Sequence, residues 1–295
     1  MPIGSPLTLE GVVLAVDIAL TLRLFDRQMR RDIEPAERDA LTTFAFGDDW
    51  AGVVWSRLDE STADAAVARL VPRLRRFAGH AEWKLYAYDR PDDLAERLVS
   101  AGLEPQDEEA VVVAELSDLD LNAPPPTGVE VRAVDDAKAV ELWVEVNELA
   151  FGERHGHVGR VLLRALDKEQ PRDLGVIAYA GGEPVSAARI EFNERSEFAS
   201  LWGGGTLAKW RGRGIYRATV LERARLAYER GYRFLQVDAL PTSRPILERL
   251  GFVQLTTTRP YVPRRMSGAS ASDIRPSSGS CTLTTDRLRL GRKGV

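Results

Sequence analysis

The chain has 295 residues, of which 44% are hydrophobic and 28% charged, a balance typical of a globular protein and not of a disordered one. Since common domains have about 100–150 residues, two domains are expected. The net charge of −4 argues against nucleic acid as a partner. One cysteine, Cys281, excludes an internal disulfide, and with three histidines it leaves little material for a metal centre.

The first apolar run extends from Gly11 to Leu24 and is interrupted by Asp17 and Arg23. It is shorter than the roughly 20 residues of a membrane span. It also lacks the basic segment and cleavage site of a signal peptide. Its helical spacing predicts a helix that buries Val16 and Leu20 on one face. We therefore expect a cytoplasmic protein that does not associate with membranes.

Two breaks suggest the domain boundaries. The stretch SDLDLNAPPPTG contains three consecutive prolines, which favour an extended linker at 123–128 between domains at 1–122 and 129–262. The segment 263–295 holds seven basic and two acidic residues, so it carries +5 and the rest of the chain −9. Its few apolar residues do not compensate the entropy of ordering the segment, and we expect it to be disordered.

An internal repeat gives the clearest indication of architecture. A shift of 149 positions places the stretch that begins at Gly52 on the one that begins at Leu201, and Asp89 on Asp238. In both copies a strand, a turn, a helix, a second strand and a short helix follow in the same order. The sequence thus predicts two copies of one α/β unit.

The elements of the second copy can be read one by one. A glycine-centred turn at Gly181-Gly182 indicates a hairpin within 175–192. Gly231 provides a left-handed stop for a long helix. The predicted elements are a strand at 129–134, a helix at 135–151, the hairpin at 175–192, a strand at 198–207, a helix at 215–230, a strand at 234–239 and a short helix from about 243 to 251.

The segment from Thr206 to Tyr216, TLAKWRGRGIY, carries the clearest chemistry. Gly212 and Gly214 permit positive φ and a close approach of main-chain N–H groups to a ligand. The helix that follows has unpaired amides and a partial positive charge at its start, which suits phosphate. Arg211 and Arg213 add charged donors. We interpret this turn as an anion site, although a glycine turn serving tight packing is the alternative.

The first copy differs at this turn. Its equivalent stretch contains Asp59, Glu60 and Asp64 and has no glycine. Negative charge and the lack of glycine are unsuited to a pyrophosphate. Only the second copy is therefore expected to bind one.

The pattern Arg-x-x-Gly after a strand and before a long helix resembles the acyl-CoA-binding motif of the GNAT superfamily of N-acetyltransferases. The resemblance covers about 134 residues well, through Arg211, Gly212 and Gly214, and the first copy is similar to a degenerate unit. It implies an α/β fold of two tandem units, each with a mixed, mostly antiparallel sheet flanked by helices. It further implies acetyl-CoA as co-substrate without a metal. The pantetheine arm would pair with the backbone at Thr206 and Leu207.

The same resemblance assigns the remaining contacts of the coenzyme. Main-chain amides from Gly212 to Tyr216 would hold the pyrophosphate, with Arg213 and Ile215 inside this stretch. Two positions depart from the family pattern. Tyr216 stands where a small residue is usual, and Leu247 stands where the family often has a tyrosine acid.

Transfer of an acetyl group to an amine needs a base, for which a carboxylate is suitable. Asp238 is the first candidate, with a structural capping role as the alternative, and Glu191 the second, with a solvated strand end as the alternative. Tyr261 is a candidate acid, or an aromatic packing residue. The pair His155 and His157 has metal-like spacing without a third ligand, and we expect a loop there.

We therefore expect the second half to move acetyl from acetyl-CoA to a primary amine of a small molecule or peptide, in a monomer or homodimer. The alternative is a catalytically silent CoA-binding or scaffold protein of the same fold. A nucleotide-phosphate enzyme is disfavoured, because the chain lacks Gly-Lys-Ser/Thr and a Rossmann glycine motif after its first strand.

Overall fold

A computed structural model describes residues 16–47, 49–152 and 156–264. Three of the sequence predictions lie wholly or partly outside these residues. They are the first part of the apolar run, the position of His155, and the disorder of the tail beyond residue 264, which contains Cys281.

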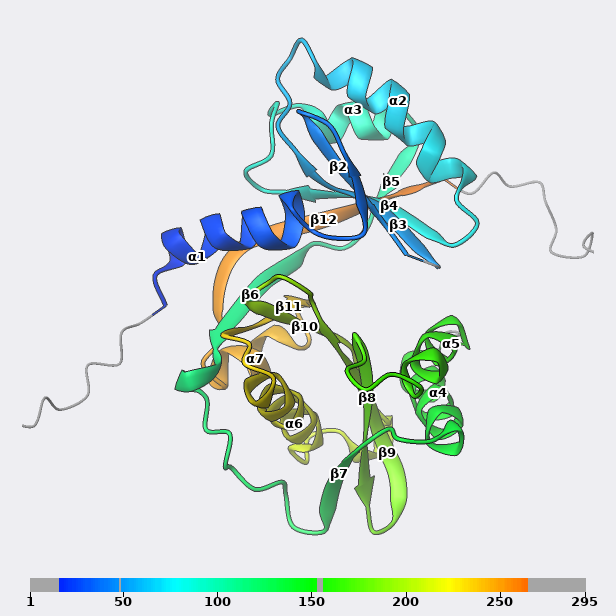
Figure 1. Cartoon of the computed structure of the whole chain (residues 1–295), viewed down its shortest axis with the longest axis vertical. Coiled ribbons are helices and arrows are strands. Elements are labelled where there is room, and N and C mark those ends of the chain that lie inside the picture. Colours follow the sequence, from blue (N-terminus) through cyan, green and yellow to red (C-terminus); the bar gives the residue numbers. More distant parts are fainter. Residues whose placement is uncertain (1–15, 48, 153–155, 265–295) are drawn as a thin grey trace, which may run out of the picture. The chain divides into compact units, whose positions relative to one another are not determined.

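The described strands form one 12-stranded sheet, in the order β1-β2-β3-β4-β12-β6-β11-β10-β9-β8-β7, with β5 beside β12 (Figure 1). Their bounds are β1 Ala36–Arg38, β2 Thr42–Phe46, β3 Trp50–Ser56, β4 His80–Tyr86, β5 Leu103–Pro105, β6 Glu109–Glu115, β7 Val129–Ala133, β8 Asp173–Ala180, β9 Glu183–Phe192, β10 Phe198–Thr206, β11 Phe234–Ala239 and β12 Val253–Pro263.

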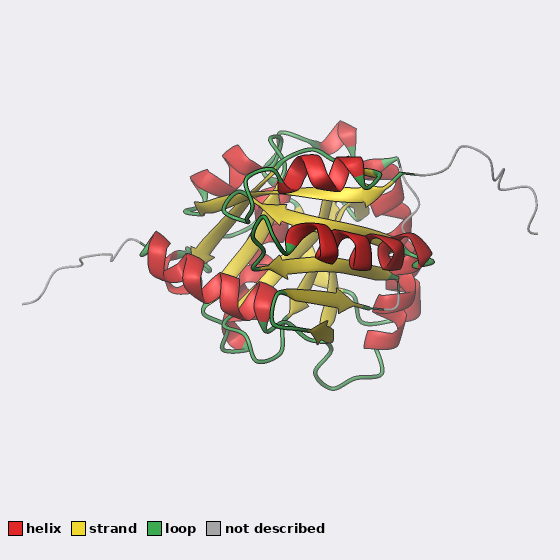
Figure 2. Cartoon of the chain, turned by 90° about the horizontal axis from the view of Figure 1, so that it is seen from above, coloured by secondary structure: helices red, strands yellow, loops and turns green. Residues whose placement is uncertain are grey.

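Seen from above, the strands lie inside and the helices outside (Figure 2). The helices are α1 Ile18–Phe25, α2 Ala63–Arg76, α3 Leu94–Ser100, α4 Ala137–Phe151, α5 Gly156–Ala165, α6 Ile215–Glu229 and α7 Arg244–Arg249. A π-helical turn follows α1 at Asp26–Arg31, and short 3-10 turns lie at Leu116–Asp118 and Ala208–Trp210.

The internal repeat is visible in the topology. Each half contains a strand, a helix and a parallel strand, as β3–α2–β4 and as β10–α6–β11. The other strand pairs in the described chain are antiparallel. The predicted fold class of two tandem units with mixed, mostly antiparallel sheets is therefore confirmed.

The two repeats exchange strands, which the sequence did not indicate. Strand β6 of the first repeat pairs with β11 of the second from Glu115–Phe234 to Ala110–Ala239. In return, β12 pairs with β4 and β5 of the first repeat. The boundaries at 122 and 129 stay a prediction, since the sheet is hydrogen-bonded across both halves.

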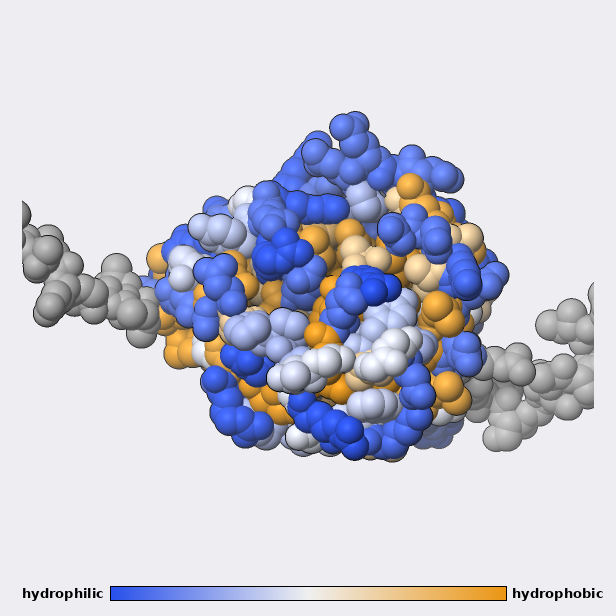
Figure 3. All heavy atoms as spheres, turned by 90° about the horizontal axis from the view of Figure 1, so that it is seen from below, coloured by the Kyte–Doolittle hydropathy of each residue, from blue (hydrophilic) through white to orange (hydrophobic). Residues whose placement is uncertain are grey.

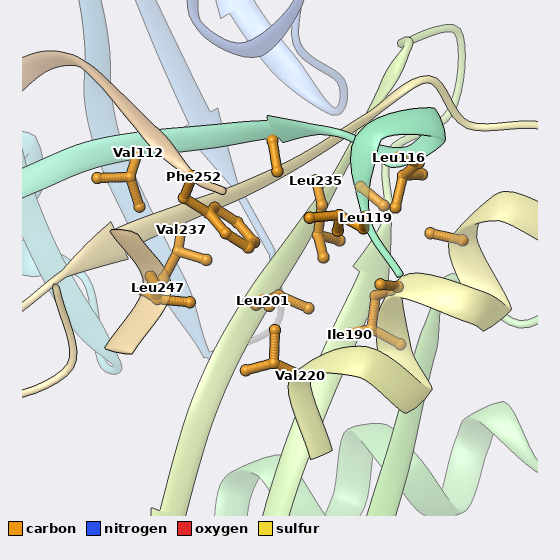
Figure 4. Packing of buried hydrophobic residues seen from close by; sticks show 14 of the residues in the cluster. Val112, Leu116, Leu119, Ile190, Leu201, Val220, Leu235, Val237, Leu247 and Phe252 are labelled. Atoms are coloured by element: carbon orange, nitrogen blue, oxygen red, sulfur yellow. The ribbon is translucent and has the colours of Figure 1, made fainter. Parts of the chain in front are cut away.

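This exchange also completes the core of the second half. Val112 of β6 packs with Leu235 of β11, Leu201 of β10 and Val220 of α6 in one cluster (Figure 4). Each such buried aliphatic side chain contributes about 1.5–3 kcal/mol. Part of the hydrophobic stabilisation of the second half therefore comes from a strand of the first.

Helices α4 and α6 cover opposite faces of the strands between them. Trp143 of α4 packs with Ile177 and Ala187, whereas α6 packs against Ile190 and Leu201. Residues 187 and 190 of β9 point to opposite sides because side chains alternate along a strand. The sheet of the second half is thus sandwiched between these helices.

Two local predictions were wrong. Leu20, predicted to be buried, is 53% exposed, because Thr21 and Phe25, four residues apart, form the inward face of α1. His157 lies in helix α5 and not in a loop. Val158 and Leu162, four residues apart, form the apolar face of this helix and pack on α4 and β8.

Polar side chains cover most of the face shown in Figure 3, with apolar residues between them. The exposed large apolar residues of the second half include Leu149 and Phe151 of α4 and Leu163 of α5. None of the helices within the described ranges is both long and apolar enough to cross a membrane.

Candidate cofactor and active site

Strands β10 and β11 separate part of the way along their length. Their parallel pairing runs from Phe198–Phe234 to Ser200–Gln236 and then stops, although β10 continues to Thr206. A β-bulge between Trp202 and Gly205 bends β10 at this point. The described chain places no strand against this edge of β10 beyond Ser200. An extended ligand could pair there as an added strand.

The end of β10 is partly engaged by the chain itself. The Leu207 N–H donates to the Val185 carbonyl at 3.0 Å, and the Leu207 carbonyl accepts from Trp210 N–H at 2.8 Å. The Thr206 hydroxyl pairs with Ser186 at 2.9 Å. The bonds to Val185 and Ser186 are made on the β9 side of β10, whereas its open edge is on the β11 side. Pairing of a pantetheine arm with Thr206 and Leu207 stays a prediction.

The turn after β10 has the geometry that its glycines suggested. Gly212 and Gly214 both lie in the left-handed region, with φ of 74° and 76°. A Cβ on Gly214 would lie 3.2 Å from Pro126 of the proline-rich linker, whereas one on Gly212 would meet nothing within 4 Å. Gly214 is thus enclosed by the linker and Gly212 faces open space.

The amides of this turn are free to bind a ligand. In the part of the chain that the structure describes, the N–H groups from Gly212 to Arg217 have no protein acceptor, and α6 has no side-chain cap. Unpaired amides at the positive end of a helix favour an anion. The backbone thus presents a run of unpaired amides at this turn, and phosphate binding there stays a prediction.

The side chains around these amides have different roles. Arg211 donates from Nε to the Thr206 carbonyl at 3.0 Å and from Nη2 to the Ala150 carbonyl at 3.3 Å, so it shapes the turn. The Arg213 guanidinium is exposed and lies 4.7 Å from the centre of the Trp210 ring. Ile215 is buried and offers only its amide. Arg213 is therefore the arginine positioned to meet an external anion.

In the first half, amides of the equivalent turn donate hydrogen bonds to a side chain of the same turn. The Asp59 carboxylate accepts from the amides of Ser61 at 3.0 Å and Thr62 at 2.9 Å, just before α2. These bonds, together with those from both hydroxyls, lower the pKa of Asp59. A carboxylate of the chain thus accepts from the amides at this turn, and the absence of ligand binding by this copy stays a prediction.

In the first half, a side chain fills the space between β3 and β4 where these strands stop pairing. Arg30 donates from Nε to the Val54 carbonyl at 2.9 Å and from Nη2 to Asp89 at 2.8 Å. Its guanidinium lies 3.8 Å from the centre of the Tyr86 ring. Space between these strands is therefore taken up by a buried arginine and its partners.

Asp238, the first candidate base, is engaged with a lysine from the other repeat. Its Oδ2 lies 2.5 Å from Lys84 Nζ, and its Oδ1 accepts from Gln236 at 2.7 Å. Lys84 Nζ also lies 3.3 Å from Glu109. Burial alone would lower the pKa of Lys84, but the carboxylates of Asp238, Glu82 and Glu109 raise it well above its usual value. Asp238 is thus a buried, paired carboxylate.

Glu109 is a candidate that sequence reasoning missed. Its side chain is 22% exposed, and burial raises its pKa above the usual value. It belongs to β6 of the first repeat, and strand exchange brings it beside Asp238. No spacing in the sequence connects the two residues.

The other two candidates lie away from Asp238. Glu191 is held by Arg172 through Nε at 2.9 Å and Nη2 at 2.5 Å. Tyr261 lies on β12 opposite Trp83, in the core of the first half, where burial raises its pKa. The structure does not bring Tyr261 to the separated strands.

The two departures from the family motif point into the protein. Leu247 is fully buried and has no proton to donate. Tyr216 turns inward, so that its Cε2 lies 2.9 Å from the point where Gly204 would carry a Cβ. The phenol therefore lies beside the separated part of β10.

Buried polar atoms without a partner gather at this site. Of the described buried side chains, Trp202 Nε1, Trp210 Nε1 and Arg223 Nη2 in the second half lack an acceptor, and Ser56 Oγ is the one in the first half. Because an unpaired buried donor costs about 1–3 kcal/mol, each of these atoms requires an explanation, and a bound ligand or an ordered water would supply the missing acceptor. Within the described ranges no group of three His, Cys, Asp or Glu could hold a metal.

The architecture matches solved structures of the GCN5-related N-acetyltransferase (GNAT) fold. No family model and no curated protein matches the sequence. A GCN5-related N-acetyltransferase from Kribbella flavida is similar with a TM-score of 0.60 at 17% identity, covering 85% of this chain and 97% of that one. A related enzyme from Sphaerobacter thermophilus gives 0.55 at 16%, covering 75% of each. A functionally unknown protein from Staphylococcus epidermidis gives 0.62 at 13%, covering 82% and 98%. The chain thus has a tandem GNAT-like fold.

Proposed function

We propose that the second half transfers an acetyl group from acetyl-CoA to a primary amine of a small molecule or peptide. The observation that carries this proposal is the run of unbonded amides from Gly212 to Arg217 at the start of α6, beside the open edge of β10. The amides suit a pyrophosphate, and the open edge suits the pantetheine arm, which carries two amide groups. The shared fold supports the reaction class.

The chain's own residues would serve the reaction in three ways. Main-chain donors near the bulge at Trp202–Gly205 stabilise the oxyanion that forms on the thioester carbonyl. Holding both reactants together contributes several kcal/mol. The carboxylates of Glu109 and Asp238, on the face of the sheet that Lys84 shares, supply a base for the amine, directly or through water.

The alternative is a silent CoA-binding or scaffold protein. It is favoured by the engagement of Asp238 with Lys84 and of Glu191 with Arg172, which leaves neither carboxylate free. Release of CoA thiol in the presence of a broad amine panel separates the two functions. Tight binding of acetyl-CoA without any thiol release would favour the silent protein.

Binding itself is tested at two glycines of the same left-handed type at opposite ends of α6. Gly212 and Gly231 have φ of 74° and 79°, and a Cβ on either would meet nothing within 4 Å. Gly212→Asp places a negative charge at the amides, and calorimetry should show acetyl-CoA binding weakened at least about tenfold, as a loss of about 1.4 kcal/mol implies. Gly231→Asp imposes a similar backbone strain, but it places its negative charge at the other end of α6, away from these amides. Equal affinities in the two variants, or equal binding of ATP and NAD, would refute the site.

A further inference from the structure

Arg223 is a buried cation whose guanidinium is incompletely bonded. Its Nε donates to the Thr219 carbonyl and its Nη1 to the Arg189 carbonyl, both at 2.9 Å. Its Nη2 has no acceptor, and the side chain is 1% exposed. Burial lowers the pKa of Arg223 to about 10, so it remains charged at neutral pH.

The described chain provides no carboxylate for this charge. A buried ion without a partner costs several kcal/mol, and acidic partners normally accompany it. The ionisable group that acts on Arg223 is the phenol of Tyr216, two helical turns earlier on α6. The arrangement is therefore complete only when a negative charge appears beside the guanidinium.

Tyr216 and Arg223 meet at Gly204. The position of a Cβ on Gly204 would lie 2.9 Å from Tyr216 Cε2 and 3.4 Å from Arg223 Nη2. Gly204 belongs to the part of β10 beyond its last pair with β11, and it lies within the bulge. The phenol and the guanidinium thus lie at the edge where, on the proposed function, the thioester arm binds.

The pKa of Tyr216 is raised overall, so the phenol carries its proton at neutral pH, and two neighbours partly offset the effect of burial. Burial raises the pKa of the phenol, while the Arg223 charge and a hydrogen bond with Ser243, at the start of α7, lower it. Arg223 is the charged side chain that acts on Tyr216 among the described residues. The unperturbed pKa of a phenol, about 10, lies above that of a thiol, about 8.5, so proton transfer to a thiolate requires a cation that stabilises the phenolate.

We propose that Tyr216 donates the proton to the departing thiolate of coenzyme A, and that Arg223 is a positioning residue that stabilises the tyrosinate left behind. This inference rests on the proposed function. The amine nitrogen forms a bond to the thioester carbonyl carbon, the C–S bond breaks, and its electron pair stays on sulfur. The Tyr216 hydroxyl proton moves to sulfur and gives the thiol. The proton lost by the amine nitrogen returns to Tyr216 through solvent, so charge and atoms balance.

The first test removes a single oxygen. Tyr216→Phe should lower kcat about 100-fold while the acetyl-CoA Kd, from calorimetry, changes less than about threefold. Tyr228→Phe, at an exposed position of the same helix, is the matched control and should keep the wild-type kcat. Unchanged turnover in Tyr216→Phe overturns the assignment, as does a loss of affinity equal to the loss of kcat. Tighter acetyl-CoA binding in that variant would identify Tyr216 as a plug instead and would also overturn it.

The second test uses the pH profile, which a merely structural role would not move. The wild-type kcat should fall at high pH as the phenol ionises, and this limb should be absent in Tyr216→Phe. Arg223→Met should move the limb to higher pH, because the cation that favours the tyrosinate is lost, and Arg223→Lys should restore it. A limb that stays in place in Arg223→Met overturns the role of this residue. Arg223→Gln, which also removes the charge but can still donate hydrogen bonds, replaces the methionine variant if that variant does not fold.

The outcomes for the two proposals are distinguishable. A wild-type chain that binds acetyl-CoA but releases no thiol with any amine overturns both. A wild-type chain that turns over, with Tyr216→Phe equally active, overturns the acid alone.

Discussion

The ion pair between Lys84 and Asp238 joins the two repeats, and its removal should be costly. In the wild type the side chains of Lys84 and Asp238 are only 9% and 5% exposed. Lys84→Met removes the cation and leaves the carboxylates of Asp238 and Glu109 in place. Removing one partner of a buried pair typically costs about 3–5 kcal/mol, because the remaining charge stays buried. Against a total stability of about 5–15 kcal/mol, this is a large share.

The assay is equilibrium denaturation with urea, with the midpoint and slope measured for each variant. Lys209→Met is the matched control, since its pair with Glu183 is 67% and 62% exposed and should contribute under about 1 kcal/mol. The double variant Lys84→Met/Asp238→Leu should recover much of the loss, because two apolar residues replace the pair. The pKa of Lys84 is raised, so its contribution is present through neutral pH and is lost only as the pH rises above the usual lysine range.

The result also separates the two roles considered for Asp238. If Lys84→Met costs no more than Lys209→Met, the pair does not stabilise the fold and the reasoning from burial is wrong. If Asp238→Asn abolishes thiol release and leaves stability unchanged, Asp238 acts as a base and not as a structural partner.

Three further predictions follow from the described contacts. Calorimetry should give one acetyl-CoA per chain, because Asp59 caps the first turn and Arg30 fills the strands beside it; two sites of equal affinity would contradict this. A hydrogen bond with Glu82 raises the pKa of His80, so its stabilisation is present below about pH 6.5 and is lost as the pH rises through the raised value. The stability difference between wild type and His80→Gln should therefore be larger at low pH, and a constant difference would disprove it. Trp143→Phe breaks the 2.8 Å bond from Nε1 to the Ala188 carbonyl and should cost at least about 1–3 kcal/mol on urea denaturation; a loss under half of that would show that the carbonyl finds another donor.

Elements set by local chemistry could be predicted from the sequence. The strand at 234–239 and the helix start at Ile215 coincide with those predicted, because β-branched alternation, glycine stops and helical spacing act over a few residues. The left-handed glycines at 212 and 214 were expected for the same reason. Repetition of these local patterns after 149 residues was enough to indicate two units.

Long-range pairing was decided only in three dimensions. Strands β6 and β12 have the same pattern whether they pair within their own repeat or with the other, so their exchange leaves no local signal. The neighbours Lys84 and Glu109 of Asp238 follow from that exchange. The unpaired Nη2 of Arg223 likewise depends on a bulge in β10 and on the inward turn of Tyr216. Sequence patterns thus determined the left-handed glycine turn before α6, whereas tertiary packing decided which side chains surround it, because contacts across a sheet join residues that no short-range spacing relates.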